Sequence, residues 1–372
     1  MIVAGEASGD LHGADFATQL RARDPACELF GIGGERMRAA GVRALINTED
    51  IAGLGLAELT STIRRTAGAL RTLRLILRRD PPDLVVLIDY AEFNLMLAGS
   101  ARRAGVPVLY YILPQVWAWR RGRIGKLVKR ARQMAVVFPF EAELYANAGG
   151  NVSFVGHPLL DRVVPAQDRP ATLARHGLKP DARLLAILPG SRHAEVGYLL
   201  RPMLEAAMVL AAKHDLTPVI ALAPTLEIAD LRAAAGAHAL EGVQIIQHDT
   251  YSIVAASELA LVASGTATLE TALLGCPMVI AYKMSPITYS LARILVRGVD
   301  YIGMPNILAG RAIVPELIQR DVTAAQLVRA AEPLLAEPLH SETAAALCAV
   351  RASLGAPGAA ARVAAMAMEL MS

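Results

Sequence analysis

The sequence predicts an α/β protein made of two parallel-sheet domains. Short apolar runs, which suit buried strands, alternate with longer amphipathic stretches along the 372 residues. The pattern is interrupted at 163–183, a stretch rich in Pro, Asp and Arg that we interpret as a linker, and it starts again with a strand at 184–188. A chain of this length usually forms two domains. We expect domains at 1–163 and 164–340, and C-terminal helices at 341–372 that pack back toward the N-terminal domain.

The composition excludes several classes of protein. Apolar residues make up 54% of the chain and aromatic residues 5%, which suits a helix-rich α/β protein with a sizeable core. No apolar run reaches the ~20 residues that a membrane-spanning helix needs. Met1 leads directly into the first strand, so we expect no signal peptide. Cys27, Cys276 and Cys348 lie far apart, so we expect reduced cysteines in a cytoplasmic protein rather than a disulfide framework or a metal site.

The net charge of +3 is unevenly distributed. Residues 1–160 carry 20 Lys and Arg against 15 Asp and Glu, whereas the remainder carries 17 against 19. The excess lies in 63–79 and 120–132. Basic helices of this kind bind anionic membranes, nucleic acid or anionic substrates, although solvated surfaces are commoner. For 63–79, an interfacial helix and a helix packed on the sheet with Arg side chains along its flanks both fit the pattern.

Polar loops follow the predicted strands of the first half. The first strand ends at Ala4, and a loop at 5–10 leads into a helix at 11–23. The strand at 84–88 ends in the sequence DYAEFN, which begins with Asp89. Side chains at the carboxyl ends of parallel strands project toward bound ligands, so Asp89 is a candidate general base. Ordering this loop or binding the acceptor is the alternative role for Asp89.

Both tryptophans follow the next strand, which we expect at 106–112. Trp117 and Trp119 lie beside the basic run, where they could stack on a sugar or contact lipid headgroups. Filling the gap between sheet and helix is the alternative. The sequence contains neither the GxGxxG spacing of dinucleotide folds nor GxxxxGK[ST], which argues against a dehydrogenase.

The stretch 259–282 organises the second half. It is typical of a strand, a tight turn at 264–266, a helix and another strand. A helix that starts at such a turn directs free N–H groups and the positive end of its dipole at the strand ends, which favours phosphate binding. Glu270 follows about one turn into the helix, where it could accept hydrogen bonds from ribose hydroxyls. A capped helix with a solvated Glu explains the same pattern. We expect the segment 305–310 to be a loop.

A series of short motifs, in order along nearly the whole chain, matches one protein family. They are AGEASGD (4–10), GIGG (31–34), VWAWR (116–120), FPFE (138–141), FVGHP (154–158), LPGSR (188–192) with Glu195, SGTATLE (264–270), PMVIAYKM (277–284), PNILAG (305–310) and EL-x-Q (316–319). With these motifs the chain resembles the lipid-A-disaccharide synthases, glycosyltransferase family 19.

This resemblance implies a GT-B fold, in which two Rossmann-like parallel-sheet domains face each other across a cleft and the second holds the UDP-sugar. It implies Asp89 and Arg192 as the catalytic residues. The implied UDP-binding residues are Gly190, Ser191, Arg192, Ser264, Gly265, Thr266, Thr268, Glu270, Lys283, Asn306 and Gln319. The acceptor-side candidates are Glu6, Ser8, Gly9, Asn94, Trp117, Trp119, Arg120 and His157. A structural role is the alternative for His157.

The resemblance also implies the reaction. UDP-2,3-diacylglucosamine would be joined to 2,3-diacylglucosamine 1-phosphate by an inverting hexosyltransferase, giving the β-1,6-linked lipid A disaccharide 1-phosphate and UDP in lipopolysaccharide biosynthesis. No metal, cofactor or nucleic acid is implied. The protein would lie peripherally on the cytoplasmic face of the inner membrane of a Gram-negative bacterium, with its bilayer contact around 54–77. A homodimer is left open.

The chain departs from the family in three places of the first half. DYAEFN stands where the family usually has DAPDFN, and Leu113 and Gln115 replace two serines. The alternative function is another GT-B UDP-sugar enzyme, such as a UDP-N-acetylglucosamine 2-epimerase, which would lack the VWAWR and AGEASGD motifs. A membrane-bound nucleotide-sugar sensor is the non-enzymatic alternative.

Overall fold

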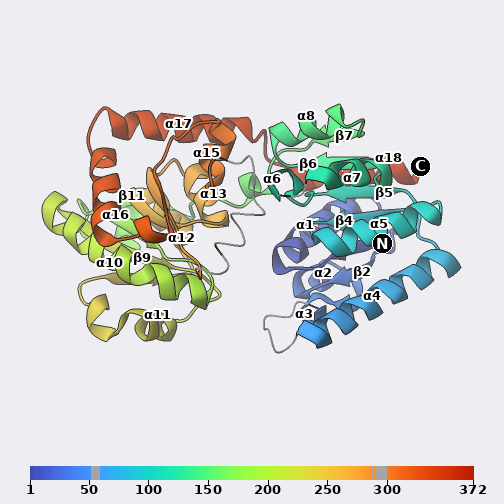
Figure 1. The fold of residues 1–372 in the computed structure, drawn as a ribbon, viewed down its shortest axis with the longest axis horizontal. Helices are drawn as coiled ribbons and strands as arrows, with labels where there is room; N and C mark the ends of the chain where they lie inside the picture. The colour runs from blue at the N-terminus through green and yellow to red at the C-terminus, as the bar shows by residue number, and fades with distance from the viewer. Residues whose placement is uncertain (52–58, 120, 286–288, 290–299) are drawn as a thin grey trace. The chain divides into compact units, whose positions relative to one another are not determined.

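In a computed structural model, which describes residues 1–372 apart from 52–58, 120, 286–288 and 290–299, the chain divides into two units. Unit 1 consists of Met1–Pro158 and Leu354–Ser372, and unit 2 of Leu159–Ser353. Each unit is a parallel sheet with helices on both faces, and both chain ends lie in unit 1 (Figure 1).

The described part of unit 1 has a sheet of seven parallel strands in the order β3-β2-β1-β4-β5-β6-β7. The central pair aligns Ile2 with Val86 and Val3 with Leu87. The strands are β1 (Ile2–Ala4), β2 (Phe30–Gly33), β3 (Arg43–Asn47), β4 (Val85–Ile88), β5 (Val108–Tyr111), β6 (Gln133–Val136) and β7 (Val152–Phe154).

The helices of unit 1 cover both faces of this sheet. They are α1 (Ala7–Arg23), α2 (Glu35–Ala39), α3 (Thr48–Ile51), α4 (Leu59–Arg79), α5 (Ala91–Arg103), α6 (Val116–Trp119), α7 (Ile124–Arg130), α8 (Pro139–Asn147) and α18 (Ala359–Met371). On one face α5 packs between α4 and α7, and on the other α1 contacts α18. Leu73 and Leu77 of α4 are buried in one apolar cluster with Val85 and Leu87 of β4.

The described part of unit 2 has a sheet of six parallel strands in the order β10-β9-β8-β11-β12-β13. The strands are β8 (Arg183–Leu188), β9 (Leu216–Leu222), β10 (Gln244–Gln247), β11 (Ser257–Ala263), β12 (Met278–Tyr282) and β13 (Glu316–Ile318). The helices are α9 (Arg169–Arg175), α10 (His193–His214), α11 (Ile228–Ala235), α12 (Thr250–Ala256), α13 (Thr266–Leu273), α15 (Met304–Ala309), α16 (Ala324–Ala331) and α17 (Leu339–Ser353).

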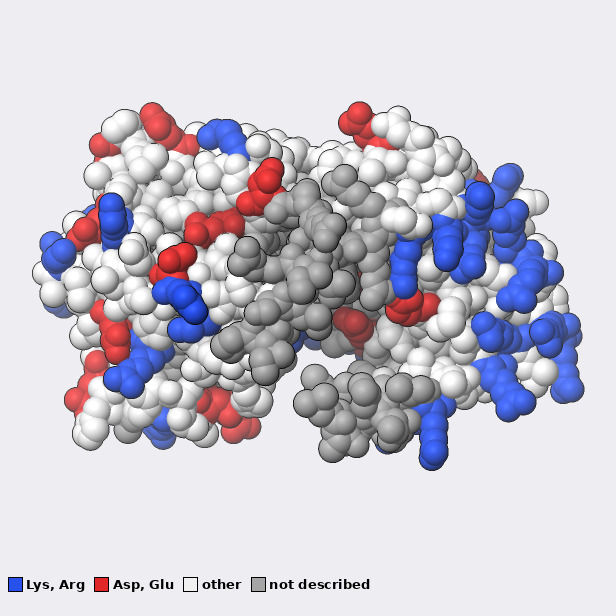
Figure 2. All heavy atoms as spheres, in the orientation of Figure 1, with Lys and Arg blue, Asp and Glu red and all other residues white. Residues whose placement is uncertain are grey.

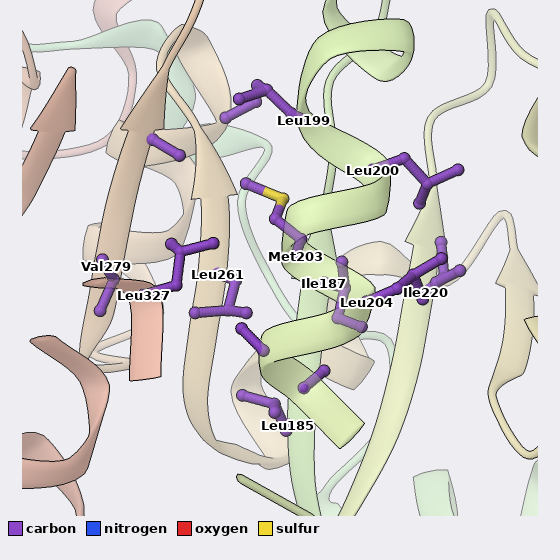
Figure 3. Packing of buried hydrophobic residues seen from close by; sticks show 14 of the residues in the cluster. Leu185, Ile187, Leu199, Leu200, Met203, Leu204, Ile220, Leu261, Val279 and Leu327 are labelled. Carbon is purple, nitrogen blue, oxygen red and sulfur yellow. The ribbon is translucent and has the colours of Figure 1, made fainter. Parts of the chain in front are cut away.

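Alternate residues of β8 enter different cores of unit 2. Leu185 and Ile187 belong to the cluster that Leu200 and Met203 of α10 cover (Figure 3). Leu184, Ala186 and Leu188 belong to the opposite cluster, which includes buried residues of α12, α13 and α17. Both faces of the strand are therefore apolar, which is the pattern of a central parallel strand.

Three segments differ from the sequence-based expectation. The first helix starts at Ala7 rather than at residue 11, because Gly9 packs against β1 and Asp10 bonds to another loop. The stretch 163–183 contains α9, and 305–310 is mostly the helix α15. Both helices carry Pro in their first turn, where its missing N–H costs nothing, so Pro marked a helix start rather than a loop.

Candidate functional site

Each sheet reverses its strand order at one point. The reversal lies between β1 and β4 in unit 1 and between β8 and β11 in unit 2. Open parallel sheets bind ligands at the carboxyl ends of the strands that flank such a point. In unit 1 the loops there carry Glu6 and Asp89, and in unit 2 they are 189–192 and 264–266. Glu6, Asp89 and the loops 189–192 and 264–266 therefore lie where this fold binds ligands, whereas the other predicted residues lie on other segments.

Asp89 lies in a strained turn directly after β4. Asp89 and Tyr90 both have left-handed backbone conformations, with φ of 46° and 48°. Such residues cost on the order of 1 kcal/mol or more each, and they persist only where the surroundings enforce them. The Asp89 carbonyl accepts hydrogen bonds from Asn94 Nδ2 at 2.8 Å and the Tyr110 hydroxyl at 3.0 Å. The backbone N–H of Asp89 donates to Ile112 O at 3.0 Å.

The environment of Asp89 makes its carboxylate more basic. Burial raises the pKa of Asp89 to about 6, and the nearby negative charge of Glu6 contributes to the rise. The side chain is half-buried, so it is not sealed inside the sheet. A carboxylate with this pKa is mostly ionised at neutral pH and is a stronger base than an ordinary Asp, as a general base requires.

The other candidates of the first two loops divide into exposed and buried residues. Glu6 and Ser8 are exposed, so they are accessible to a ligand. Gly9 is buried, and a Cβ there would lie 3.2 Å from the Cβ of Ala4. Asn94 is fully buried, and its amide donates only to backbone carbonyls of the Asp89 turn. Asn94 therefore holds this turn in place.

Trp117 lies in the interior of unit 1. Its side chain is 7% exposed, and its ring meets Phe140 edge-on at 4.9 Å between centroids. The indole N–H donates to Glu141 at 3.1 Å, and burial raises the pKa of Glu141 to about 7. Trp117 therefore packs inside the domain, which is the alternative to stacking on a sugar or contacting lipid headgroups. Trp119 is the last residue of α6, and Arg120 lies outside the described residues.

His157 is also buried. Its side chain is 8% exposed, and its ring centroid lies 5.1 Å from that of Phe138. Burial, and to a lesser degree the neighbouring His12, lowers the pKa of His157 to about 3. The imidazole is therefore neutral at physiological pH and is a weak base, which favours the structural role.

Asp10 joins two of the sequence motifs. Its side chain is 6% exposed and accepts hydrogen bonds from the backbone N–H groups of Gly34 at 2.6 Å, Arg36 at 3.1 Å and Met37 at 3.1 Å. A Cβ at Gly34 would lie 2.6 Å from a carboxylate oxygen of Asp10. The AGEASGD and GIGG motifs are therefore matched to each other, because the carboxylate needs a glycine beside it.

We expect Asp10→Ala to destabilise the protein by about 3 kcal/mol, because three backbone donors lose their acceptor. Urea unfolding measures this loss. The control is Asp24→Ala, which removes a carboxylate at the exposed end of α1 and should cost less than about 1 kcal/mol. Equal stabilities of the two variants would contradict this role for Asp10.

Glu195 shapes the PGSR loop of unit 2. Its carboxylate accepts hydrogen bonds from the N–H of Ser191 at 3.0 Å and from Nη1 of Arg192 at 2.9 Å. Gly190 has a φ of 124°, and a Cβ there would lie 2.6 Å from the Cβ of Glu195. The Thr225 hydroxyl donates to Ser191 O at 2.6 Å. The loop is fixed, but the Arg192 side chain is 77% exposed and accessible to an anion.

The turn before α13 leaves the amides of Gly265 and Thr266 at an open helix start, whereas the N–H of Ser264 donates to Ala281 O at 2.9 Å. No side chain of the described residues caps this helix at Gly265, and a Cβ there would meet no described atom within 4 Å. The Thr268 hydroxyl is buried and donates to Gly265 O at 2.8 Å, which closes the turn. Ser264 and Thr266 flank it, partly and fully exposed. Free N–H groups at an open helix start suit an anion.

Glu270 and Lys283 lie near the same edge of the sheet. Glu270 is half-buried on α13, and one of its oxygens accepts a hydrogen bond from the Tyr251 hydroxyl at 3.0 Å. Burial raises the pKa of Glu270. Lys283 directly follows β12 and is half-buried.

Asn306 and Gln319 differ in what they offer a ligand. The Asn306 amide is fully buried and uses all four of its hydrogen-bonding positions on Ile313, Val314 and Glu316. It orders its own loop, so a direct nucleotide contact stays a prediction. Gln319 has a left-handed φ of 56°, and its buried Nε2 has no hydrogen-bond partner among the described residues.

Comparison with known proteins decides the family. The family model for lipid-A-disaccharide synthetase matches residues 1–368. This chain belongs to that family. The lipid-A-disaccharide synthase of Geobacter metallireducens is 44% identical in an alignment of 373 positions that covers 100% of this chain and 97% of the relative. That of Syntrophus aciditrophicus is 44% identical over 379 residues, with the same coverage. The resemblance based on the motifs is confirmed.

Solved structures place this lipid-A-disaccharide synthase family member among GT-B proteins. MurG of Acinetobacter baumannii matches with a TM-score of 0.61 at 16% identity, covering 99% of this chain and 98% of MurG. The UDP-GlcNAc 2-epimerase of Neisseria meningitidis, solved with UDP-GlcNAc, matches with a TM-score of 0.58 at 12% identity over 99% and 98%. Likeness at such identity shows the fold alone. The predicted fold class is confirmed, and the epimerase alternative has only the fold in its favour.

Two polar residues of this family member were missed by reasoning from the sequence. Glu195 was quoted with the LPGSR motif, but its bonds to Ser191 and Arg192 were not predicted. Thr225 and Tyr251 bond to residues 34 and 19 positions away, so only the folded chain reveals them.

Proposed function

We propose that the protein is an inverting glycosyltransferase that joins UDP-2,3-diacylglucosamine to 2,3-diacylglucosamine 1-phosphate. The products are the β-1,6-linked lipid A disaccharide 1-phosphate and UDP. The observation that carries this proposal is the match of residues 1–368 to the lipid-A-disaccharide synthetase family. The open, uncapped helix start in unit 2 supports it further, because a donor diphosphate needs such a site.

Unit 2 binds the donor in this proposal. The amides of Gly265 and Thr266, the exposed Arg192 and Lys283 hold the diphosphate, and Glu270 accepts hydrogen bonds from the ribose. Gln319, whose Nε2 has no hydrogen-bond partner among the described residues, supplies a further donor. Fixed N–H groups and cations stabilise the charge that develops on a departing diphosphate.

Unit 1 activates the acceptor. The oxygen of the acceptor 6-hydroxyl attacks the anomeric carbon of the donor, and its proton passes to the Asp89 carboxylate. The bond from the anomeric carbon to the diphosphate oxygen breaks, and its electron pair leaves with UDP. Attack opposite the leaving group inverts the anomeric centre. The raised pKa of Asp89, about 6, suits the carboxylate to this transfer.

Cations gather on the α4–α5–α7 face of unit 1 (Figure 2). Its exposed basic residues are Arg64, Arg65, Arg71, Arg78, Arg79, Arg102, Arg103, Lys126 and Lys129. Leu75 on α4 is 47% exposed beside them. Among the described residues, no helix has the length and hydropathy to cross a bilayer. We propose that this face binds the anionic surface of the inner membrane from the cytoplasmic side, with apolar and basic contacts acting together.

We expect the protein to co-sediment with phosphatidylcholine vesicles that contain phosphatidylglycerol, and to be released in part by high salt. The double variant Arg71→Gln/Arg78→Gln should bind roughly 30-fold more weakly, since each cation near an anionic surface contributes about 1 kcal/mol. The double variant Arg201→Gln/Arg232→Gln removes two exposed arginines of unit 2 and should bind as the unaltered protein does. If both double variants lost vesicle affinity equally, the α4–α5–α7 face would not be the membrane-binding surface.

An assay with radiolabelled 2,3-diacylglucosamine 1-phosphate and UDP-2,3-diacylglucosamine tests the reaction. We expect a labelled disaccharide and an equal amount of UDP, and no UDP release when the acceptor is left out. An epimerase would change UDP-N-acetylglucosamine without any acceptor. That outcome, with no disaccharide, would overturn the proposal.

A further inference from the structure

Glu270, the residue proposed to bind the ribose, accepts a hydrogen bond from a residue on a neighbouring helix. Glu270 lies on α13, which follows β11, whereas Tyr251 lies on α12, which follows β10. The two helices pack against each other, and the Tyr251 hydroxyl donates to Oε1 of Glu270 at 3.0 Å. Both side chains are half-buried. This is the hydrogen bond that the structure gives the Glu270 carboxylate.

The start of α12 is itself anchored on both sides of Tyr251. Asp249 is 7% exposed, and its Oδ2 lies 2.8 Å from Nε2 of His176 at the end of α9. Ser252 is 1% exposed, and its hydroxyl accepts a hydrogen bond from the N–H of Ala166 at 3.1 Å. Asp249 and Ser252, which lie on either side of Tyr251, both bond to the segment 166–176. The Tyr251 hydroxyl is therefore a donor in a fixed position.

A fixed donor matters because the end of a Glu side chain otherwise has a broad choice of orientation. The bond from Tyr251 occupies Oε1 and leaves Oε2 to accept another hydrogen bond. We propose that Tyr251 is a positioning residue, which orients Glu270 so that Oε2 accepts a ribose hydroxyl of the UDP-sugar. This inference rests on the proposed function, and it adds a determinant of ribose recognition outside the family motifs quoted above.

Binding of UDP, 2′-deoxy-UDP and 3′-deoxy-UDP, measured by calorimetry, tests the proposal. We expect the unaltered protein to prefer UDP over one of the deoxy analogues by about tenfold or more, as a hydrogen bond to a charged group implies. Tyr251→Phe keeps the ring and removes the donor. It should reduce this preference to about threefold or less, and raise the KM for the donor sugar with kcat little changed. Glu270→Gln should remove most of the preference.

Tyr198→Phe is the matched control, because Tyr198 is 38% exposed on α10 and has no assigned role. It should keep the full preference. If Tyr251→Phe keeps the preference while Glu270→Gln loses it, the positioning role is wrong and the donor site stands. The same holds if Tyr251→Phe only lowers the melting temperature. If Glu270→Gln also keeps the preference, or if the unaltered protein shows none, the ribose assignment is wrong and the positioning role fails with it.

Discussion

Replacing Asp89 with Asn is expected to reduce kcat by about 10²- to 10⁴-fold while UDP still binds, because a positioned general base contributes this much. Asn tolerates the left-handed backbone of this position, so the turn is kept. Steady-state kinetics with both lipid substrates and calorimetry with UDP measure the two effects. Near-normal turnover would exclude the base role.

Glu92→Gln is the control for this substitution. Glu92 lies three residues further along, its side chain is 54% exposed, and it pairs with Arg123. We expect turnover within about twofold of normal, since a surface ion pair contributes little. A loss equal to that of Asp89→Asn would mean that any change of charge in this segment disturbs the site.

Asp89→Asn should also be more stable to unfolding than the unaltered protein above pH 6. The pKa of Asp89 in the folded state is raised from 3.8 to about 6, so the folded state holds its proton more tightly than the unfolded state does. The stability that this proton provides is present below pH 4 and is lost as the pH rises through about 6. Asn carries no such dependence, so Asp89→Asn should gain up to about 3 kcal/mol at pH 8 relative to pH 4. Urea unfolding at the two pH values measures this.

Replacing Arg192 with Ala is expected to reduce kcat/KM for the donor by about 10²- to 10³-fold. A cation that contacts charge developing in the transition state contributes ~2–4 kcal/mol. Its side chain is 77% exposed, and its loop follows β8, the neighbour of the strand β11 that precedes the 264–266 turn. Stability should change little, because the pair with Glu195 is on the surface.

Arg201→Ala is the control for this loss. Arg201 lies on α10, which begins directly after Arg192, and it forms an exposed ion pair of the same kind, with Glu205 at 3.0 Å. We expect an unchanged kcat/KM. If Arg192→Ala also left kcat/KM unchanged, Arg192 would be removed from the donor site.

The strands and their following loops could be predicted because buried parallel strands have a plain signal. β8, β11 and β12 are short apolar runs, and each ends where a polar loop begins. Right-handed crossovers then determine which loops meet at the reversal of strand order. This is why Asp89, Arg192 and the 264–266 turn could be placed at the carboxyl ends of these strands from the sequence, whereas their roles stay predictions.

The features that were not predicted depend on contacts between distant residues, which local sequence patterns do not indicate. The sequence does not indicate that Trp117 turns inward to Glu141, or that Asn306 uses its whole amide on its own loop. Pro170 and Pro305 were interpreted as marks of a linker and a loop, although each lies in the first turn of a helix. The strands β3 and β13 were not predicted because neither contains a fully buried residue, so their sequences lack the continuous apolar run of a central strand.

A crystal structure of the protein with UDP tests the central claim most directly, namely that the donor diphosphate sits where α13 begins. We predict phosphate oxygens about 2.7–3.2 Å from the backbone N–H groups of Gly265 and Thr266, with Arg192 on the diphosphate and Glu270 on the ribose. UDP bound away from the carboxyl ends of β8 and β11 would contradict the account.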